Sequence, residues 1–169
     1  HAGHREGCPS PTGCMLGLAM EHFDVIVIGS GPAGEGAAMQ AAKSGKRVLV
    51  VERQPQVGGG CTHWGTIPSK ALRHSVQSLV EARRNPLFGA VASGVHFEFP
   101  RLLALATGVI GRQVQMRADF YTRNGVRVER GQARLLSPKV LEVDDGSGST
   151  TSFVAEVIVI ATGSRPYRP

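Results

Sequence analysis

From Met20 onward, short apolar runs alternate with stretches that favour helix. FDVIVIG (23–29) and KRVLVVE (46–52) are rich in β-branched residues, and their continuous apolar character predicts two buried parallel strands. Between them Pro32 suits the first turn of a helix, AAMQAAK favours helix, and Gly45 is placed to end it. The pattern predicts a βαβ unit with a right-handed crossover.

The rest of the chain predicts two helices followed by short strands. Apolar residues at helical spacing indicate an amphipathic helix over 69–84, a loop over 85–98 and a second helix over 99–123. Short strands then flank the polar turn DDGSGS, and VIVI (157–160) predicts a last buried strand. Together these elements predict an α/β fold with a parallel central sheet and a small β-meander.

Composition narrows the class of protein without naming a function. The 169 residues suffice for one domain, and 41% hydrophobic with 19% charged residues is ordinary for a soluble globular protein. A formal charge of +6 favours anionic partners, but aromatic residues make up only 5% and the basic residues are scattered, which disfavours nucleic acid. No apolar run approaches the roughly 20 residues that a membrane span requires.

The first nineteen residues differ from the patterned region. They lack the features of a signal peptide, and we expect residues 1–19 to be a disordered extension or an artefact of the start site, with a domain over 20–169. His4, Cys8 and Cys14 match no familiar zinc spacing, so no metal site is predicted. Three cysteines, the third being Cys61, make no disulfide framework, which fits a reducing cytoplasm.

GSGPAGEG (29–36) contains the spacing G-x-G-x-x-G directly after a predicted strand and at the start of a predicted helix. Gly29 permits a tight turn, Gly31 lets the backbone approach a pyrophosphate, and Gly34 lets the helix pack against the strand. Glu52 ends the next strand, 18 residues after Gly34, where its carboxylate suits a ribose diol and repels a 2′-phosphate. The alternative is a glycine-rich turn without a ligand, but strand, helix and acid together favour a dinucleotide such as FAD or NAD.

A second glycine-rich stretch, GGGCTHWGTIPSK, covers 58–70. Pro68 lacks an N–H and its ring collides with the carbonyl of Trp64, so a helix running from about residue 62 is expected to kink near there. Thr66 and Lys70, four residues apart, would then share one helix face. Cys61 alone indicates either a small core residue or a nucleophile.

Four stretches in order, GSGPAGEGAA, Glu52, GGGCTHWGTIPSKALRH and IVIATGSRP, resemble the FAD-dependent pyridine nucleotide-disulfide oxidoreductases, such as lipoamide dehydrogenase and glutathione reductase. The resemblance runs from about residue 22 to the end, and it implies a Rossmann-like FAD-binding domain. In that family a kinked helix carries two cysteines spaced C-x-x-x-x-C next to the flavin.

This chain departs from that pattern at Thr66, which stands where the family has its second cysteine. A disulfide requires two sulfurs with Cα atoms within about 7 Å, and Cys61 has no sequence neighbour that could serve. The CTHWGTIPSK form resembles a bacterial branch of the family, which implies that FAD passes hydride between NADPH and NAD without a sulfur relay.

The resemblance also implies roles for individual residues. Lys70, Thr66 and Cys61 are the expected catalytic residues beside the flavin, with the Lys70 cation favouring the electron-rich reduced flavin. The expected FAD-binding residues are Gly29, Gly31, Pro32, Gly34, Glu52, Arg53, Gly58, Gly59, Gly60, Cys61, Thr66, Lys70, Gly131, Gln132, Ala133, Ala161, Thr162 and Gly163. Gly60 replaces a threonine found in many reductases, which removes one hydroxyl contact to the cofactor.

The family continues with an NAD(P)-binding domain and a dimerisation domain, so these 169 residues are expected to be about the first third of a homo-oligomeric protein and inactive alone. Two alternatives stay open at this point. The parent could be a flavin reductase or diaphorase that uses the single thiol of Cys61, or the chain could be a non-catalytic flavin-binding module.

Overall fold

The computed structural model describes residues 20–96 and 98–165, and the expectations for residues 1–19 lie outside them. The first unit is β1 (Glu21–Ile28), α1 (Pro32–Lys43) and β2 (Val48–Glu52). Strands β1 and β2 are parallel neighbours, with Val25 paired to Val48. The predicted βαβ unit is confirmed, because all five residues of β2 are buried and α1 begins at Pro32.

One six-stranded sheet contains every strand of the described residues, in the order β3-β2-β1-β6-β5-β4. Strands β3 (Arg127–Arg130), β2, β1 and β6 (Thr150–Ile160) run parallel, whereas β4 (Gln132–Ser137) and β5 (Val140–Asp144) complete it as antiparallel strands. The fold is therefore the expected α/β fold with a parallel centre and a small β-meander, and the meander continues the same sheet.

Each face of the sheet carries its own apolar cluster. On one face, α1 covers Val27 and Val50, and Tyr121 of α5 (Phe99–Arg123) joins them. On the other, Phe23 packs against Phe153 of β6 with ring centroids 6.0 Å apart. Leu141 and Val143 of β5 belong to this second cluster with Leu49 and Val51 of β2, so the sheet curls over itself to enclose a core without a helix.

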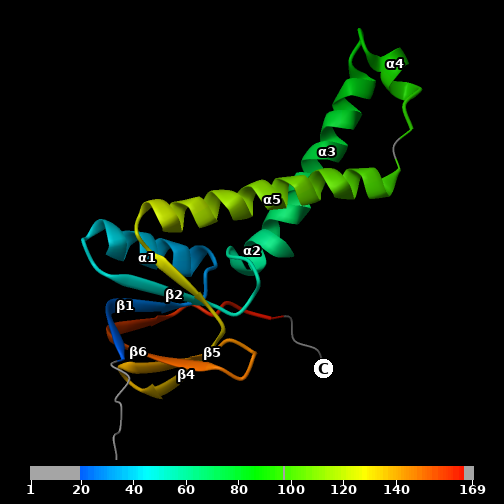
Figure 1. Cartoon of the computed structure of the whole chain (residues 1–169). Helices are drawn as coiled ribbons and strands as arrows, with labels where there is room; N and C mark the ends of the chain where they lie inside the picture. Colours follow the sequence, from blue (N-terminus) through cyan, green and yellow to red (C-terminus); the bar gives the residue numbers. More distant parts are fainter. Residues whose placement is uncertain (1–19, 97, 166–169) are drawn as a thin grey trace, which may run out of the picture.

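The remaining helices project from the sheet (Figure 1). The short α2 (Gly59–His63) leads into α3 (Thr66–Arg84), which runs away from the sheet to α4 (Gly89–Ser93), and α5 returns above α1. The predicted loop over 85–98 is therefore wrong in part, because GAVAS forms a helical turn. Alanine and small residues permit that turn after Asn85 ends α3, although five residues with no Glu or Lys carry little periodic signal.

The last strand forms as predicted, but the prediction that VIVI (157–160) is buried is wrong, because two of its residues are exposed and Ile158 and Val159 are only partly buried. Val157 is 53% exposed and Ile160 64% exposed. Pairing explains the difference: β5 accompanies β6 only as far as Val154, and beyond it the described residues pair with β1 alone. The apolar run predicted the strand correctly but not which of its neighbours cover it.

No helix in the described ranges combines the length and the apolar character that crossing a membrane requires.

Candidate functional site

The carboxyl ends of β1, β2 and β6 meet at one edge of the sheet. The Gly29 N–H donates to Val51 O at 2.8 Å, and the Ala161 N–H donates to Ile28 O at 2.9 Å. Gly29 has a φ of +104°, and a Cβ on it would lie 2.4 Å from Ala161 O. The first glycine of G-x-G-x-x-G thus serves both a left-handed turn and the close passage of the 161–163 segment.

The third glycine sets the position of α1. A Cβ on Gly34 would lie 1.9 Å from Gly29 O, so no other residue fits while the helix rests on the turn. Gly31 is the N-cap residue of α1 and provides no side-chain cap, and Pro32 follows it. The N–H groups of this first turn and the positive end of the helix dipole are therefore available to an anion.

The two glycine-rich stretches lie against each other. A Cβ on Gly59, whose φ is +61°, would approach Gly31 Cα to 2.7 Å. A Cβ on Gly31 would meet only Gly59 Cα, at 3.9 Å, so the space over Gly31 is open. Two stretches 28 residues apart in the sequence thus form one backbone surface without side chains.

Glu52 ends β2 beneath this surface and is 7% exposed. Its Oε2 accepts hydrogen bonds from the Ser30 N–H (3.0 Å) and from the Ser30 hydroxyl (2.5 Å), and its Oε1 accepts one from the Gln54 N–H (2.9 Å). Because a carboxylate offers about four acceptor positions, one position is left, on Oε1. The neighbouring Arg53 is exposed to solvent.

The stretch from Cys61 to Lys70 is broken into two helices. Cys61 lies in α2 as a partly buried free thiol, whereas Thr66 begins α3 and Lys70 lies one turn later, both exposed. The predicted interruption of this helix near Pro68 is confirmed, and it is a full break rather than a kink. The chain leaves helical geometry earlier, at Trp64 and Gly65, so Pro68 falls in the first turn of α3, where a missing N–H costs nothing.

Gly65 is what permits the break. Its N–H donates to Gly60 O at 2.8 Å, and a Cβ on Gly65 would lie 3.0 Å from that same oxygen. The shared helix face predicted for Thr66 and Lys70 is confirmed by their places in α3.

The predicted residues that follow β3 and β6 differ in how closely they contact this edge of the sheet. The Gly131 N–H donates to Glu52 O at 3.0 Å, and a Cβ on Gly131 would lie 2.5 Å from Asp144 O. Gln132 is exposed, but Ala133 packs against the core cluster of the second sheet face. Thr162 and Gly163, which follow Ala161, are exposed.

Two polar residues of the site escaped the sequence-based selection. Ser30 is the variable position inside G-x-G, and Thr62 follows Cys61; both are fully buried. The Ser30 hydroxyl accepts a hydrogen bond from the Gly58 N–H at 3.0 Å, whereas Thr62 Oγ1 has no partner among the described residues. The spacing of the glycines says nothing about either residue, so the sequence offers no signal for them.

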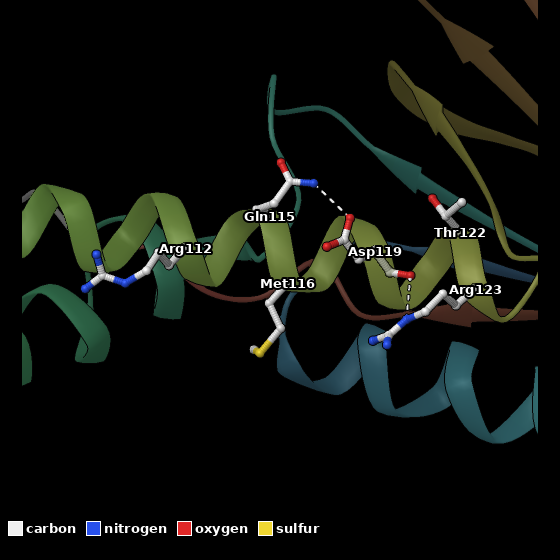
Figure 2. Close-up of a pocket in the computed structure, with 6 residues that line it drawn as sticks. All are labelled: Arg112, Gln115, Met116, Asp119, Thr122 and Arg123. Carbon is white, nitrogen blue, oxygen red and sulfur yellow. Dashed lines mark hydrogen bonds between the residues drawn. The ribbon is translucent and has the colours of Figure 1, made fainter.

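Two hollows on the surface of the described residues are lined by none of the predicted FAD-binding residues. The larger one, about 450 Å³, follows the outer face of α5 (Figure 2), where Gln115 donates to Asp119. All six residues that line it come from that single helix, with Arg112 at one end and Arg123 at the other. A smaller one of about 140 Å³ lies between residues 54–56 and the rings of His63 and Trp64. No group of three metal-ligating side chains occurs in the described part of the chain.

The edge formed by these turns fits a dinucleotide. An uncapped helix N-terminus faces the open space over Gly31, and a buried carboxylate with one free acceptor position lies below it. The sequence profile of the pyridine nucleotide-disulphide oxidoreductase family matches residues 23–169. The chain belongs to that family.

Relatives within the pyridine nucleotide-disulphide oxidoreductase family agree with this assignment. The chain is 51% identical over 152 residues to a protein of Chromohalobacter salexigens named soluble pyridine nucleotide transhydrogenase, covering 90% of this chain and 33% of the relative. A protein of the same name from Vibrio cholerae is 51% identical over 148 residues, or 88% of this chain and 32% of the relative. The chain thus spans about a third of the length of these curated relatives.

Solved structures give the same fold. The HOCl-induced flavoprotein disulfide reductase RclA from Escherichia coli, in its Cu(II) complex, superposes with a TM-score of 0.73 at 25% identity, over 89% of this chain and 30% of that one. Without the metal, the TM-score is 0.70 at 26% identity, over 86% and 29%. The fold is therefore the Rossmann-like fold of flavoprotein reductases, as expected.

Proposed function

We propose that this chain is the FAD-binding portion of a flavoprotein that transfers hydride between NADPH and NAD through bound FAD, without a redox disulfide. The observation that carries the proposal is the 51% identity, over 90% of the chain, to a relative named soluble pyridine nucleotide transhydrogenase. Thr66, at the start of α3, supports it because no second sulfur follows Cys61 there.

Residues 20–169 form the N-terminal part of an FAD-binding domain in this account. The domains for NAD(P) and for dimerisation then belong to the two thirds of the relatives' length that the chain does not match. The substrates are NAD and NADP(H), the full-length protein is a homo-oligomer, and neither nucleic acid nor a membrane is a partner. A reducing cytoplasm is the expected compartment.

In this proposal, different residues at the sheet edge bind different parts of FAD. The turn 29–34 with the N-terminus of α1 would hold the pyrophosphate, and Glu52 Oε1 would accept a hydrogen bond from a ribose hydroxyl. FAD supplies a two-electron centre that accepts and returns hydride. The remaining predicted contacts are Arg53, Gly58, Gly59, Gly60, Gly131, Gln132, Ala133, Ala161, Thr162 and Gly163.

Three side chains of α2 and α3, those of Cys61, Thr66 and Lys70, would lie beside the reacting end of the cofactor. Lys70 places a positive charge there, and a fixed cation stabilises the additional negative charge of a reduced ring. Thr66 replaces a sulfur with a hydroxyl, which does not undergo thiol–disulfide exchange. Cys61 is a contact of the cofactor and transfers no electrons in this account.

The test is a pair of absorbance experiments on the full-length protein that contains this chain. Its oxidised flavin spectrum should bleach on anaerobic addition of NADPH and return on addition of an NAD analogue. Bleaching without recovery indicates a diaphorase instead. The 169-residue chain alone should bind FAD weakly or not at all and show no turnover, and robust NADPH-dependent reduction of the analogue by it would refute that part.

A further inference from the structure

Ser30 lies at the centre of the hydrogen bonds that organise the sheet edge. It is fully buried, and both its backbone N–H and its hydroxyl donate to the same oxygen, Oε2 of Glu52 (3.0 and 2.5 Å). The hydroxyl also accepts the hydrogen bond from the Gly58 N–H at 3.0 Å. One hydroxyl group therefore joins the first glycine turn, the carboxylate of β2 and the second glycine turn.

The bonds to Ser30 fix the direction of the carboxylate. With Oε2 held by two donors and Oε1 by the Gln54 N–H, the Glu52 side chain cannot rotate without breaking buried hydrogen bonds. Breaking them is costly because hydrogen bonds to a charged acceptor are among the stronger ones in proteins. The one free acceptor position on Oε1 therefore points in a constant direction.

The hydrogen bond between Ser30 and Gly58 also fixes the turn that precedes Cys61. Gly58 has a φ of +117° and is the N-cap residue of α2, and a Cβ on it would lie 2.8 Å from Thr62 Oγ1. Its N–H has the Ser30 hydroxyl as acceptor. The start of α2 is thus tied to the same group that orients Glu52.

We propose that Ser30 is a positioning residue, which orients Glu52 for a ribose hydroxyl and couples the adenosine side of the site to the turn that precedes Cys61. This inference rests on the proposed function only in taking the ligand to be an adenine dinucleotide. Ser30 acts through Glu52 and Gly58, so its loss should alter selectivity for the ribose more than affinity for the phosphates.

The test measures binding of ADP and of 2′,3′-dideoxy-ADP to the flavin-free full-length protein. The wild type should prefer ADP by about tenfold or more, as expected for a hydrogen bond to a charged group. Ser30→Ala should reduce this preference to about twofold, and Glu52→Gln should do the same. Ser30→Ala combined with Glu52→Gln should lower it no further, since residues that act as a unit are not additive.

Two further variants separate positioning from charge and from folding. Glu52→Asp keeps the charge but shortens the side chain away from Ser30, and it should lose the preference as fully as Glu52→Gln. Ser44→Ala removes an exposed hydroxyl, bonded to Gln40 O at the other end of α1, and should leave the preference unchanged. These measurements still test the proposal if Ser30→Ala does not fold.

Amide hydrogen exchange tests the second part of the proposal, the hydrogen bond from the Gly58 N–H to the Ser30 hydroxyl. Exchange of the Gly58 amide should be at least tenfold faster in Ser30→Ala and unchanged in Ser44→Ala. A wild-type protein with no preference for ADP would refute the dinucleotide site itself. If the wild type prefers ADP and both Ser30→Ala and Glu52→Asp keep that preference, the role of Ser30 is refuted and the dinucleotide site is not.

Discussion

At the residue scale, the site depends on places where the backbone passes so closely that a Cβ has no room. Gly34 is the clearest, with Gly29 O 1.9 Å from the position of its Cβ. Gly36, two residues later in α1, has no heavy atom within 4 Å of that position. The same helix therefore contains a glycine required by contact and a glycine that contributes only backbone freedom.

Gly34→Ala should lower the free energy of unfolding by about 3 kcal/mol or more, since α1 must shift from the turn to admit the methyl group. Gly36→Ala should raise it by about 0.5 to 1 kcal/mol, because alanine restricts the unfolded chain and fits the helix. Urea denaturation of both variants measures the difference. Equal effects would show that the turn does not constrain α1.

Tyr121 offers a second test at this scale. It is 1% exposed, and its hydroxyl has no hydrogen-bond partner among the described residues. Tyr121→Phe should raise the free energy of unfolding by about 1 kcal/mol, since an unpaired buried hydroxyl costs about that much. A loss of similar size in thermal or urea unfolding would instead reveal a partner for the hydroxyl.

The same residue gives a pH dependence. Burial, together with the charges of Glu35 and then Glu52, raises the pKa of Tyr121 above its ordinary value of 10.0. As pH rises through that value the unfolded chain releases this proton and the folded chain keeps it. Stability should therefore fall above about pH 10, by up to about 1.4 kcal/mol per pH unit. The fall should be shallower in Tyr121→Phe, and identical pH profiles would contradict the raised pKa.

At the scale of elements, an ion pair as well as apolar contacts joins α5 to α1. Arg117 Nε lies 3.0 Å from Glu35 Oε2, with side chains 12% and 21% exposed, although the two groups are not aligned as a hydrogen bond. Arg117 also donates to Gln113 on its own helix. A partly buried charge that loses its partner is costly, so this pair holds α5 above the N-terminal half of α1.

Arg117→Ala should lower the free energy of unfolding by about 2 to 4 kcal/mol, because Glu35 is left without its counter-charge. Arg112→Ala on the exposed side of α5 should change it by less than about 0.5 kcal/mol. A double-mutant cycle with Glu35→Gln in urea denaturation isolates the pair. A coupling energy near zero would show that apolar packing alone places α5.

The elements also show which parts of the fold could be predicted from the sequence. The βαβ unit followed from local patterns, because strand, cap and glycine signals agree over 23–52. The end of α2 did not follow from them, because Pro68 is visible in the sequence whereas the break at Gly65 depends on the hydrogen bond from its N–H to Gly60 O. The exposure of Val157 depends on where β5 stops, which no local pattern encodes.

At the scale of the whole molecule, the candidate site is an assembly of turns from distant parts of the chain. The motif spacing predicted Gly29, Gly31, Gly34 and Glu52, and the structure brings them together with Gly131 at one edge of the sheet. Ser30 could not be selected from the motif, since its importance comes from hydrogen bonds to two residues, Glu52 and Gly58, 22 and 28 residues away. The spacing of a motif can therefore predict the residues that contact a ligand. The residues that hold those contacts in place can be found only from the folded structure.

The central claim is that hydride passes between two nicotinamides without a thiol. The measurement that tests it most directly is the steady-state rate of NADPH-dependent reduction of an NAD analogue by the full-length protein, compared between wild type and Cys61→Ser. Cys61→Ser should retain most of the wild-type rate, whereas Lys70→Ala should lose about tenfold or more by removing the fixed cation. A Cys61→Ser variant that binds FAD normally but has no activity would contradict the account.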